Sequence, residues 1–287
     1  IKVIAPYMRG NLKILPYFGK RKISEITEAD VRKWQNELMK EENGYSQTYL
    51  RTINNQLSAI MNYAVKYYDL PRNPCKQAGS IGKGNADEMN FWTKSEFDVF
   101  IEGMRDSPRA YIAFQMLYWT GIRIGELLAL TCKDIDFNEQ VVHITKSYQR
   151  INRKDVITQP KTEKGIRHVT LPGFLVEELW EYMGRLYGYM PEDRIFQFTK
   201  SWLEHEMLLG VKKTGVKKIR LHDIRHSHAS LLISELKMEP LLVADRLGHE
   251  KIQTTLNTYS HLYPNQSRDL ADKLDQIYTY TKEEKRE

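Results

Sequence analysis

Residues 221–229 read LHDIRHSHA, a run of three histidines around one arginine. The chain from Pro172 onward has mainly helical patterning, so we expect this run to lie on a helix. His222 and Arg225 are three residues apart, which on a helix directs both side chains to the same side. The run therefore predicts a helix that presents an imidazole and a guanidinium together.

A zinc site is the alternative interpretation of this run. His222 and His226 are four residues apart, the spacing of a helical zinc pair. The metalloprotease version of that motif has Glu in the second position, where this chain has Asp223. A catalytic zinc also needs a third ligand, and no neighbouring cluster of ligands is evident in the sequence. We therefore expect no metal.

A second run, TGIRIGELLAL at residues 120–130, carries another arginine. We expect Gly121 to give a sharp entry into a helix, with Arg123 in the first turn. Unpaired backbone N–H groups and a guanidinium fork together favour a bound phosphate. Glu126 shares a face with Arg123 and can orient it. An ordinary amphipathic helix with a surface Arg–Glu pair remains the alternative.

Two shorter signals follow near the end of the sequence. Gly248 is typical of a helix C-terminus, which places His249 on the turn that follows. Tyr259 lies in TTLNTYSH at residues 254–261, and Tyr263 is close behind. A lone histidine is more often structural, and one tyrosine among 17 carries no signal by itself.

Helical patterning dominates the rest of the chain. Thr27 and Ser46 are expected N-caps of two helices. Thr93 begins a capping box just after Phe91, where a second domain starts. The apolar stripes predicted for the first two helices comprise Val31, Trp34, Leu38 and Met39, and then Ile53, Leu57, Ile60, Met61, Ala64 and Val65.

Two further stretches break the helical pattern. The Gly-rich polar stretch at 77–90 is typical of an interdomain linker. β-Branched residues at 141–145, 156–158 and 167–171 predict a three-stranded antiparallel sheet. The expected fold class is therefore mainly α with a small antiparallel β-sheet, in two domains.

Charge and cysteine content narrow the class of partner. Residues 1–83 hold 14 Lys and Arg against 7 Asp and Glu, whereas the remainder holds 29 against 30. A basic domain, with further basic clusters at 146–167 and 212–220, favours nucleic acid. The two cysteines lie in no cluster, which argues against a disulfide framework. No apolar run is long enough to cross a bilayer, and we expect no membrane partner.

The ordered set Arg123, His222-x-x-Arg225, Leu247-Gly248-His249 and Tyr259 resembles the signature of the tyrosine recombinase, or phage-type integrase, family. The local sequence around these residues is most similar to the sequences of integrases of conjugative transposons and temperate phages. His249 and Tyr259 are ten positions apart in this chain, whereas the corresponding gap is nine in many members of the wider family. Pro160-Lys161-Thr162 matches the place of the family's lysine, in a β-turn of the small sheet.

The resemblance implies a fold and an organisation. It implies a C-shaped clamp of a helical core-binding domain, 1–76, and a catalytic domain, 91–287, joined by the linker 77–90. Arg51, Asn54 and Asn55 are the expected groove contacts of the first domain. The sequence has no starting Met, and many relatives carry a further N-terminal DNA-binding domain; the sequence leaves open whether an arm-binding domain was removed.

The resemblance also implies a mechanism without metal, ATP or other cofactor. Arg123 and Arg225, assisted by His222 and His249, would stabilise the phosphorane, with Glu126 in support. Tyr259 would become joined to the 3′ phosphate, and Lys161 would protonate the leaving 5′ oxygen. Tyr263 is the fallback nucleophile.

The implied partners are double-stranded DNA attachment sites, three further protomers in a tetramer, and accessory DNA-bending or excision proteins. A C-terminal segment with Leu270, Leu274, Ile277 and Tyr278 is expected to dock on a neighbour or on its own domain. The implied location is the bacterial cytoplasm. A type IB topoisomerase and a non-catalytic DNA-binding regulator are the alternatives.

Overall fold

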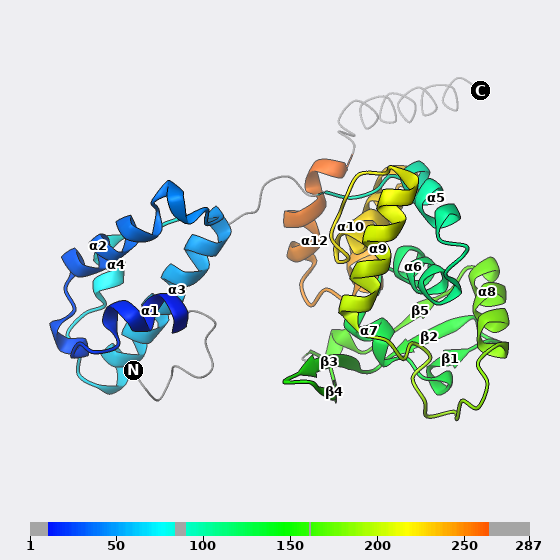
Figure 1. Ribbon diagram of the computed structural model, residues 1–287, viewed down its shortest axis with the longest axis horizontal. Helices are drawn as coiled ribbons and strands as arrows, with labels where there is room; N and C mark the ends of the chain where they lie inside the picture. The colour runs from blue at the N-terminus through cyan, green and yellow to red at the C-terminus, as the bar shows by residue number, and fades with distance from the viewer. Residues whose placement is uncertain (1–10, 84–89, 161, 264–287) are drawn as a thin grey trace, which may run out of the picture. The chain divides into compact units, whose positions relative to one another are not determined.

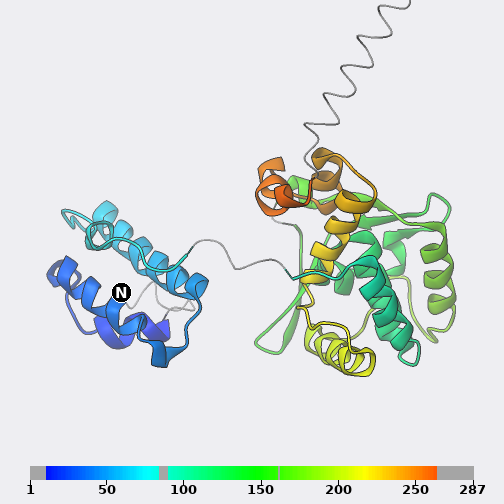
Figure 2. The same ribbon diagram turned by 90° about the horizontal axis from the view of Figure 1, so that it is seen from above.

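A computed structural model describes residues 11–83, 90–160 and 162–263. The chain divides into two compact units, residues 1–88 and 89–287, which are described separately below. Both are drawn in Figures 1 and 2, where the colour runs from blue at the N-terminus to red at the C-terminus. Helices predominate, with two small antiparallel sheets, so the expected fold class is confirmed.

The first unit is helical throughout its described residues. Its core combines an apolar face of α3 with side chains of α2 and α1, and Trp34 is enclosed in it with 1% of its surface exposed. Thr27 and Ser46 cap α2 and α3 as expected. Met39 and Val65 were expected in the buried stripes but are 44% and 38% exposed, and Met39 is the C-cap that follows α2. The elements are α1 Asn11–Phe18, η2 Ile23–Glu25, α2 Glu28–Leu38, η3 Glu41–Asn43, α3 Gln47–Tyr67 and α4 Pro74–Ala78.

The second unit opens with helices that surround its largest apolar core. The capping box at Thr93 begins α5, as expected. α6 is buried on nearly all sides and packs against α8 and α10. The helices of this unit are α5 Lys94–Gly103, α6 Pro108–Thr120, α7 Ile124–Ala129, η4 Cys132–Asp134, η5 Glu163–Gly165, α8 Gly173–Gly184, α9 Lys200–Thr214, α10 Asp223–Ser230, η6 Leu231–Glu235, α11 Pro240–Leu247, α12 Ile252–Tyr259 and η7 Ser260–Leu262.

The strands of the second unit form two sheets rather than the one expected. β1 (Ile135–Asp136), β2 (Val141–Ile144) and β5 (Arg167–Thr170) pair antiparallel in the order β1-β2-β5. β3 (Ser147–Ile151) and β4 (Lys154–Thr158) form a separate hairpin. Residues 156–158 therefore pair with β3 and not with the larger sheet, because the two-residue turn Asn152-Arg153, with positive φ at both positions, folds β4 directly back on β3.

Candidate active site

Arg225 occupies the centre of a cluster built from the ends of several helices. It lies on α10, and only 4% of its surface is exposed. Its Nη1 donates to the carbonyl of Gly121 at 2.7 Å and its Nη2 to that of Leu247 at 2.5 Å. Burial, with the nearby charge of Arg123, lowers the pKa of Arg225 to about 9, which still leaves the guanidinium charged at neutral pH. A fixed buried cation is suited to binding a phosphate.

Arg123 approaches the same turn from the other side. It was expected in the first turn of a helix, but it is the N-cap of α7 with extended backbone. The reason lies at Gly121, which has a φ of +66° and ends α6 instead of opening the next helix. The Nη2 of Arg123 lies 3.4 Å from the carbonyl of Gly248, next to the carbonyl that holds Arg225. Two guanidinium groups from distant segments therefore meet at residues 247–248.

Glu126 contacts Arg123 as the three-residue spacing predicted, with 2.8 Å between Arg123 Nη1 and Glu126 Oε1. The sequence analysis missed a second partner, Arg167 on β5, which holds both carboxylate oxygens at 2.8 and 3.1 Å. Burial opposes ionisation of Glu126, but the hydrogen bonds and charge of Arg167 outweigh it and lower the pKa of that carboxyl. In the sequence, Arg167 was visible only as one member of a basic cluster.

His222 and His249 border the arginines. His222 is the N-cap of α10, three residues before Arg225, as its spacing predicted. Gly248 ends α11 with a φ of +68°, which places His249 on the next turn, also as expected. The Nδ1 of His249 lies 2.8 Å from the hydroxyl of Thr255. Partial loss of hydration, together with the charge of Arg225, lowers the pKa of His222. Burial, with the charge of Arg225, lowers the pKa of His249 to about 4, so that imidazole is neutral at pH 7.

Tyr259 is the last residue of α12, and only 1% of its surface is exposed. Its hydroxyl lies 2.7 Å from Nδ1 of His226, a contact that the sequence analysis did not find. Burial raises the pKa of Tyr259 to about 12, against a smaller opposing effect of Arg225. Tyr263 follows η7, and its buried hydroxyl has no hydrogen-bond partner among the described residues. Of the two tyrosines, Tyr259 is the one whose ionised form is stabilised by the charge of Arg225.

Lys161 lies outside the described residues. Its neighbours Pro160 and Thr162 line a cleft of about 330 Å³ together with Arg123, Glu126 and Gly248. The chain on both sides of position 161 therefore borders the cluster of arginines.

The zinc interpretation of His222 and His226 finds no support in the side chains around them. Their rings are 5.3 Å apart and nearly perpendicular, and Nδ1 of His226 faces the hydroxyl of Tyr259. Within residues 11–83, 90–160 and 162–263, no three His, Cys, Asp or Glu side chains are grouped closely enough to hold a metal ion. The third ligand that a catalytic zinc requires is thus missing from that part of the chain.

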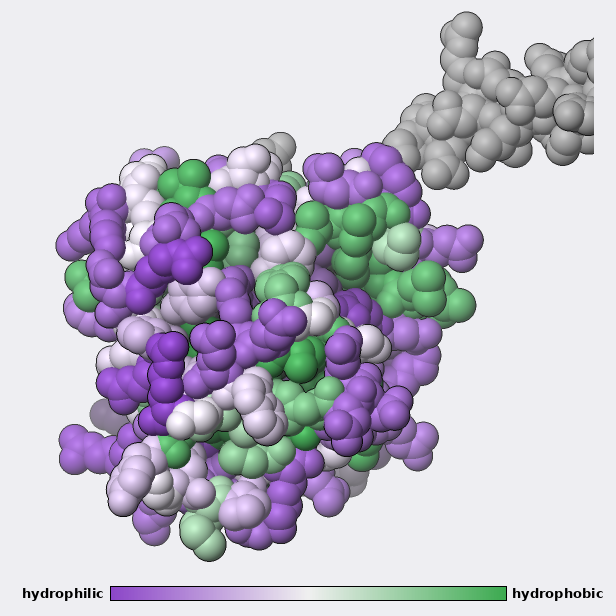
Figure 3. Space-filling view, turned by 90° about the vertical axis from the view of Figure 1, so that its right-hand side faces the viewer, coloured by the Kyte–Doolittle hydropathy of each residue, from purple (hydrophilic) through white to green (hydrophobic). Residues whose placement is uncertain are grey.

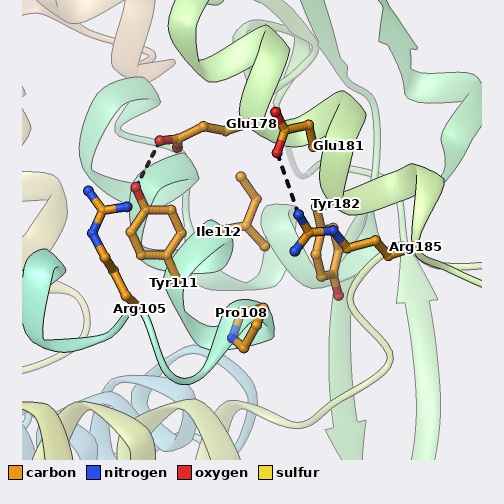
Figure 4. A pocket seen from close by; sticks show the side chains of 8 residues that line it. All are labelled: Arg105, Pro108, Tyr111, Ile112, Glu178, Glu181, Tyr182 and Arg185. Carbon is orange, nitrogen blue, oxygen red and sulfur yellow. Dashed lines mark hydrogen bonds and ion pairs between the residues drawn. The ribbon is translucent and has the colours of Figure 1, made fainter.

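A separate pocket of about 220 Å³ lies between α6 and α8 (Figure 4), and neither Arg123 nor Arg225 lines it. Its carboxylates already have partners, since Glu178 accepts from the hydroxyl of Tyr111 at 2.8 Å and Glu181 faces Arg185 at 3.6 Å. Figure 3 shows one face of the second unit, where hydrophilic residues cover most of the surface and hydrophobic ones gather in smaller patches.

The three expected DNA contacts of the first unit differ in accessibility. Arg51 is half-buried and Asn55 is exposed, both on α3. Asn54 is 3% exposed, and its side-chain oxygen accepts from Gln35 at 2.9 Å. A buried amide with an internal partner cannot reach a groove, so the expectation for Asn54 is wrong. The docking segment at Leu270, Leu274, Ile277 and Tyr278 lies outside the described residues.

No helix in the described part of the chain is both long enough and apolar enough to span a membrane. Comparisons with known proteins identify the family. The family model described as the phage integrase family matches residues 91–266, and a phage integrase N-terminal SAM-like domain matches residues 10–39.

Among the relatives, the ICEBs1 integrase of Bacillus subtilis strain 168 is 33% identical over an alignment of 286 positions, which covers 93% of this chain and 75% of that protein. An XerC-like tyrosine recombinase of Caldanaerobacter subterraneus is 28% identical over 305 residues, covering 95% and 76% of the two chains.

Solved structures share the fold. The integrase of transposon Tn1549 in complex with a circular-intermediate DNA is 17% identical, with a TM-score of 0.74 over 96% of this chain and 97% of that one. A lambda integrase dimer bound to a COC′ core site is 15% identical, with a TM-score of 0.63 over 88% and 89%. With the family match across most of the second unit, these findings show that the chain belongs to the phage integrase family and is a tyrosine recombinase.

Proposed function

We propose that this site-specific recombinase cuts and rejoins DNA attachment sites through a covalent link between Tyr259 and the 3′ phosphate, and so integrates or excises a mobile element. One observation carries the proposal. Arg123 and Arg225 bind the adjacent carbonyls of Gly248 and Leu247, directly before His249. Two cations and an imidazole from three distant segments thus meet at one turn, as stabilisation of a pentavalent phosphorane requires.

The chemistry follows from the charges of these groups. Arg123 and Arg225 would bind the non-bridging oxygens of the scissile phosphate, whose charge increases in the transition state. His222 and the neutral His249 would add hydrogen bonds to the same oxygens. Glu126 would keep Arg123 in place through their 2.8 Å contact.

Strand exchange then needs two balanced steps. In the first, the Tyr259 hydroxyl would pass its proton to Nδ1 of His226 at 2.7 Å. The Tyr259 oxygen bonds to phosphorus, the bond from phosphorus to the 5′ oxygen breaks, and Lys161 protonates that oxygen. In the second, a 5′ hydroxyl from the partner strand gives its proton to the now neutral Lys161 and attacks the phosphotyrosine, and the released Tyr259 recovers its proton from His226. Each step exchanges one phosphoester for another, so no ATP is needed.

We infer that the first unit binds duplex DNA as a core-binding domain and that the second is the catalytic domain, with 77–90 as the linker. The net charge of +7 over residues 1–83 supports this assignment. The Tn1549 and lambda integrases were solved on DNA. By analogy, we propose a clamp around the attachment site, a tetramer on two duplexes, accessory DNA-bending or excision proteins, and a place in the bacterial cytoplasm.

The test is to trap the covalent intermediate. A duplex with the element's attachment site is nicked near the scissile phosphate, so that the short fragment released by cleavage diffuses away. We expect a protein–DNA adduct on denaturing gels, formed equally well in excess EDTA. Peptide mapping should find the phosphate on Tyr259. An adduct on Tyr263, or no adduct at all, would overturn the proposal.

A matched experiment separates recombination from topoisomerase action. Supercoiled plasmids with and without the attachment site are incubated with equal amounts of protein. We expect recombinant products and relaxation only where the site is present. Equal relaxation of both plasmids would favour the type IB topoisomerase alternative instead.

A further inference from the structure

Arg167 is a buried arginine that contacts three of the segments around the site. It lies on β5 with 8% of its surface exposed. Its two Nη atoms hold both oxygens of Glu126 on α7, and its Nε donates to the carbonyl of Arg246 at the end of α11 at 3.0 Å. Its Nη1 also lies 3.4 Å from the carbonyl of Gly165, in the turn that follows Lys161 in the sequence. One planar side chain thus connects three segments that carry candidate catalytic groups.

The Arg167 side chain packs closely against the turn at Gly248. Gly248 lies against it so closely that a Cβ added there would be 2.9 Å from Arg167 Cδ and 3.0 Å from Nη1. A glycine is also required at that position by its φ of +68°. The turn before His249 is therefore shaped against Arg167.

Arg167 also sets the charge balance between Glu126 and Arg123. Glu126 has one negative charge and two arginine partners, of which Arg167 takes both oxygens and Arg123 shares one. Because Arg167 balances the carboxylate, Arg123 retains net positive charge, and its side chain is 41% exposed toward solvent. Without Arg167, Glu126 would be balanced by Arg123 alone, and a phosphate would have to compete with that carboxylate.

We propose that Arg167 is a positioning residue for strand cleavage, which binds Glu126 so that Arg123 stays aligned and free to bind the scissile phosphate. The proposal rests on the function proposed above. Arg167 itself need not touch DNA, and its effect would be on the rate of cleavage rather than on the affinity for the site.

The central variant is Arg167→Met, which keeps an unbranched side chain but removes the charge and the fork. At saturating DNA, we expect its single-turnover cleavage to be about 100-fold slower than that of the parent, the scale found when one group that stabilises a transition-state charge is lost. DNA affinity should change by less than about threefold. Arg167→Lys should remain slow, because a point charge cannot hold both oxygens of Glu126. Arg185→Met, which breaks the exposed pair with Glu181, is the matched control and should cleave at the parent rate.

A second substrate separates positioning from a general loss of structure. A methyl group replaces one non-bridging oxygen of the scissile phosphate, which removes the charge that Arg123 would neutralise. The 100-fold defect of Arg167→Met should shrink to about tenfold or less on this substrate, because the phosphate then depends less on Arg123, which Glu126 holds in that variant. A misfolded site would slow both substrates equally, and that result would overturn the inference.

Adding Glu126→Gln to Arg167→Met gives an independent measurement. The double variant has no buried carboxylate left to compete for Arg123, so we expect at least tenfold recovery of cleavage relative to Arg167→Met. Cleavage by Arg167→Met at the parent rate would also refute the inference. If the parent itself forms no adduct, the proposed function fails first, and the two failures are thus distinguishable.

Discussion

Removing one oxygen from Tyr259 should abolish chemistry at a small cost in stability. In Tyr259→Phe the ring keeps its packing, but the 2.7 Å hydrogen bond to the half-buried His226 is lost and its Nδ1 has no partner. Loss of a buried hydrogen bond that leaves one group unsatisfied costs about 1–2 kcal/mol. For a unit of this size, that is a fall in Tm of roughly 2–8 °C. The hydroxyl is enclosed, so affinity for site DNA should stay within about twofold, or about 0.4 kcal/mol.

The assay compares Tyr259→Phe with Tyr263→Phe on the nicked duplex. The Tyr263 hydroxyl is buried and has no hydrogen-bond partner within the described residues, so its removal should leave Tm unchanged or slightly higher. Adduct should be absent from the first variant and normal in the second. Adduct formed by Tyr259→Phe, or lost in Tyr263→Phe, would refute the assignment of the nucleophile. An unchanged Tm in Tyr259→Phe would refute the reasoning about the hydrogen bond with His226.

Four further predictions concern other groups. Arg225→Lys should bind site DNA but cleave about 100-fold more slowly, because an ammonium cannot span two carbonyls; parental cleavage rates would contradict this. Lys161→Ala should cleave poorly but recover on a substrate with sulfur at the 5′-bridging position, since a thiolate leaves without a proton; no recovery would reject Lys161 as the acid. Asn54→Ala should lower the thermal stability of the first unit, whereas Asn55→Ala should weaken only DNA binding; the opposite pattern in melting and binding curves would restore the original assignment. The second unit should lose stability as pH falls from about 6.5 to 4. In this range His249 takes up a proton in the unfolded chain, whereas in the folded protein its pKa of about 4 keeps it neutral; an unchanged Tm across that range would disprove the shift.

Local signals in the sequence were sufficient to predict much of the fold. Thr27, Ser46 and Thr93 begin helices because each has a side-chain oxygen able to accept from the first turn, which is a property of a few neighbouring residues. The sheet was predicted less well. Which strand pairs with residues 156–158 is decided by the positive φ of Asn152 and Arg153, which no periodicity reports.

Within the site, too, the sequence predicted contacts between residues that are close along the chain and missed contacts between distant ones. The contact between Arg123 and Glu126 spans three residues and follows from helical spacing. The pair Arg167–Glu126 spans 41 residues and the contact between His226 and Tyr259 spans 33, so each depends on tertiary packing. Such partners cannot be read from a pattern along a single chain.

The carbonyls that accept hydrogen bonds from Arg225 affect how the DNA-free protein binds anions. Gly121 caps the C-terminus of α6, and Leu247 is the last residue of α11, so Arg225 lies at the negative ends of two helix dipoles. Helix termini supply only partial charges, unlike a carboxylate, and they keep the arginine charged without neutralising it. Within residues 11–83, 90–160 and 162–263, no carboxylate forms an ion pair with this guanidinium. Small oxyanions such as sulfate or pyrophosphate should bind at this guanidinium and compete with the scissile phosphate, in addition to weakening the salt-dependent contacts of the first unit.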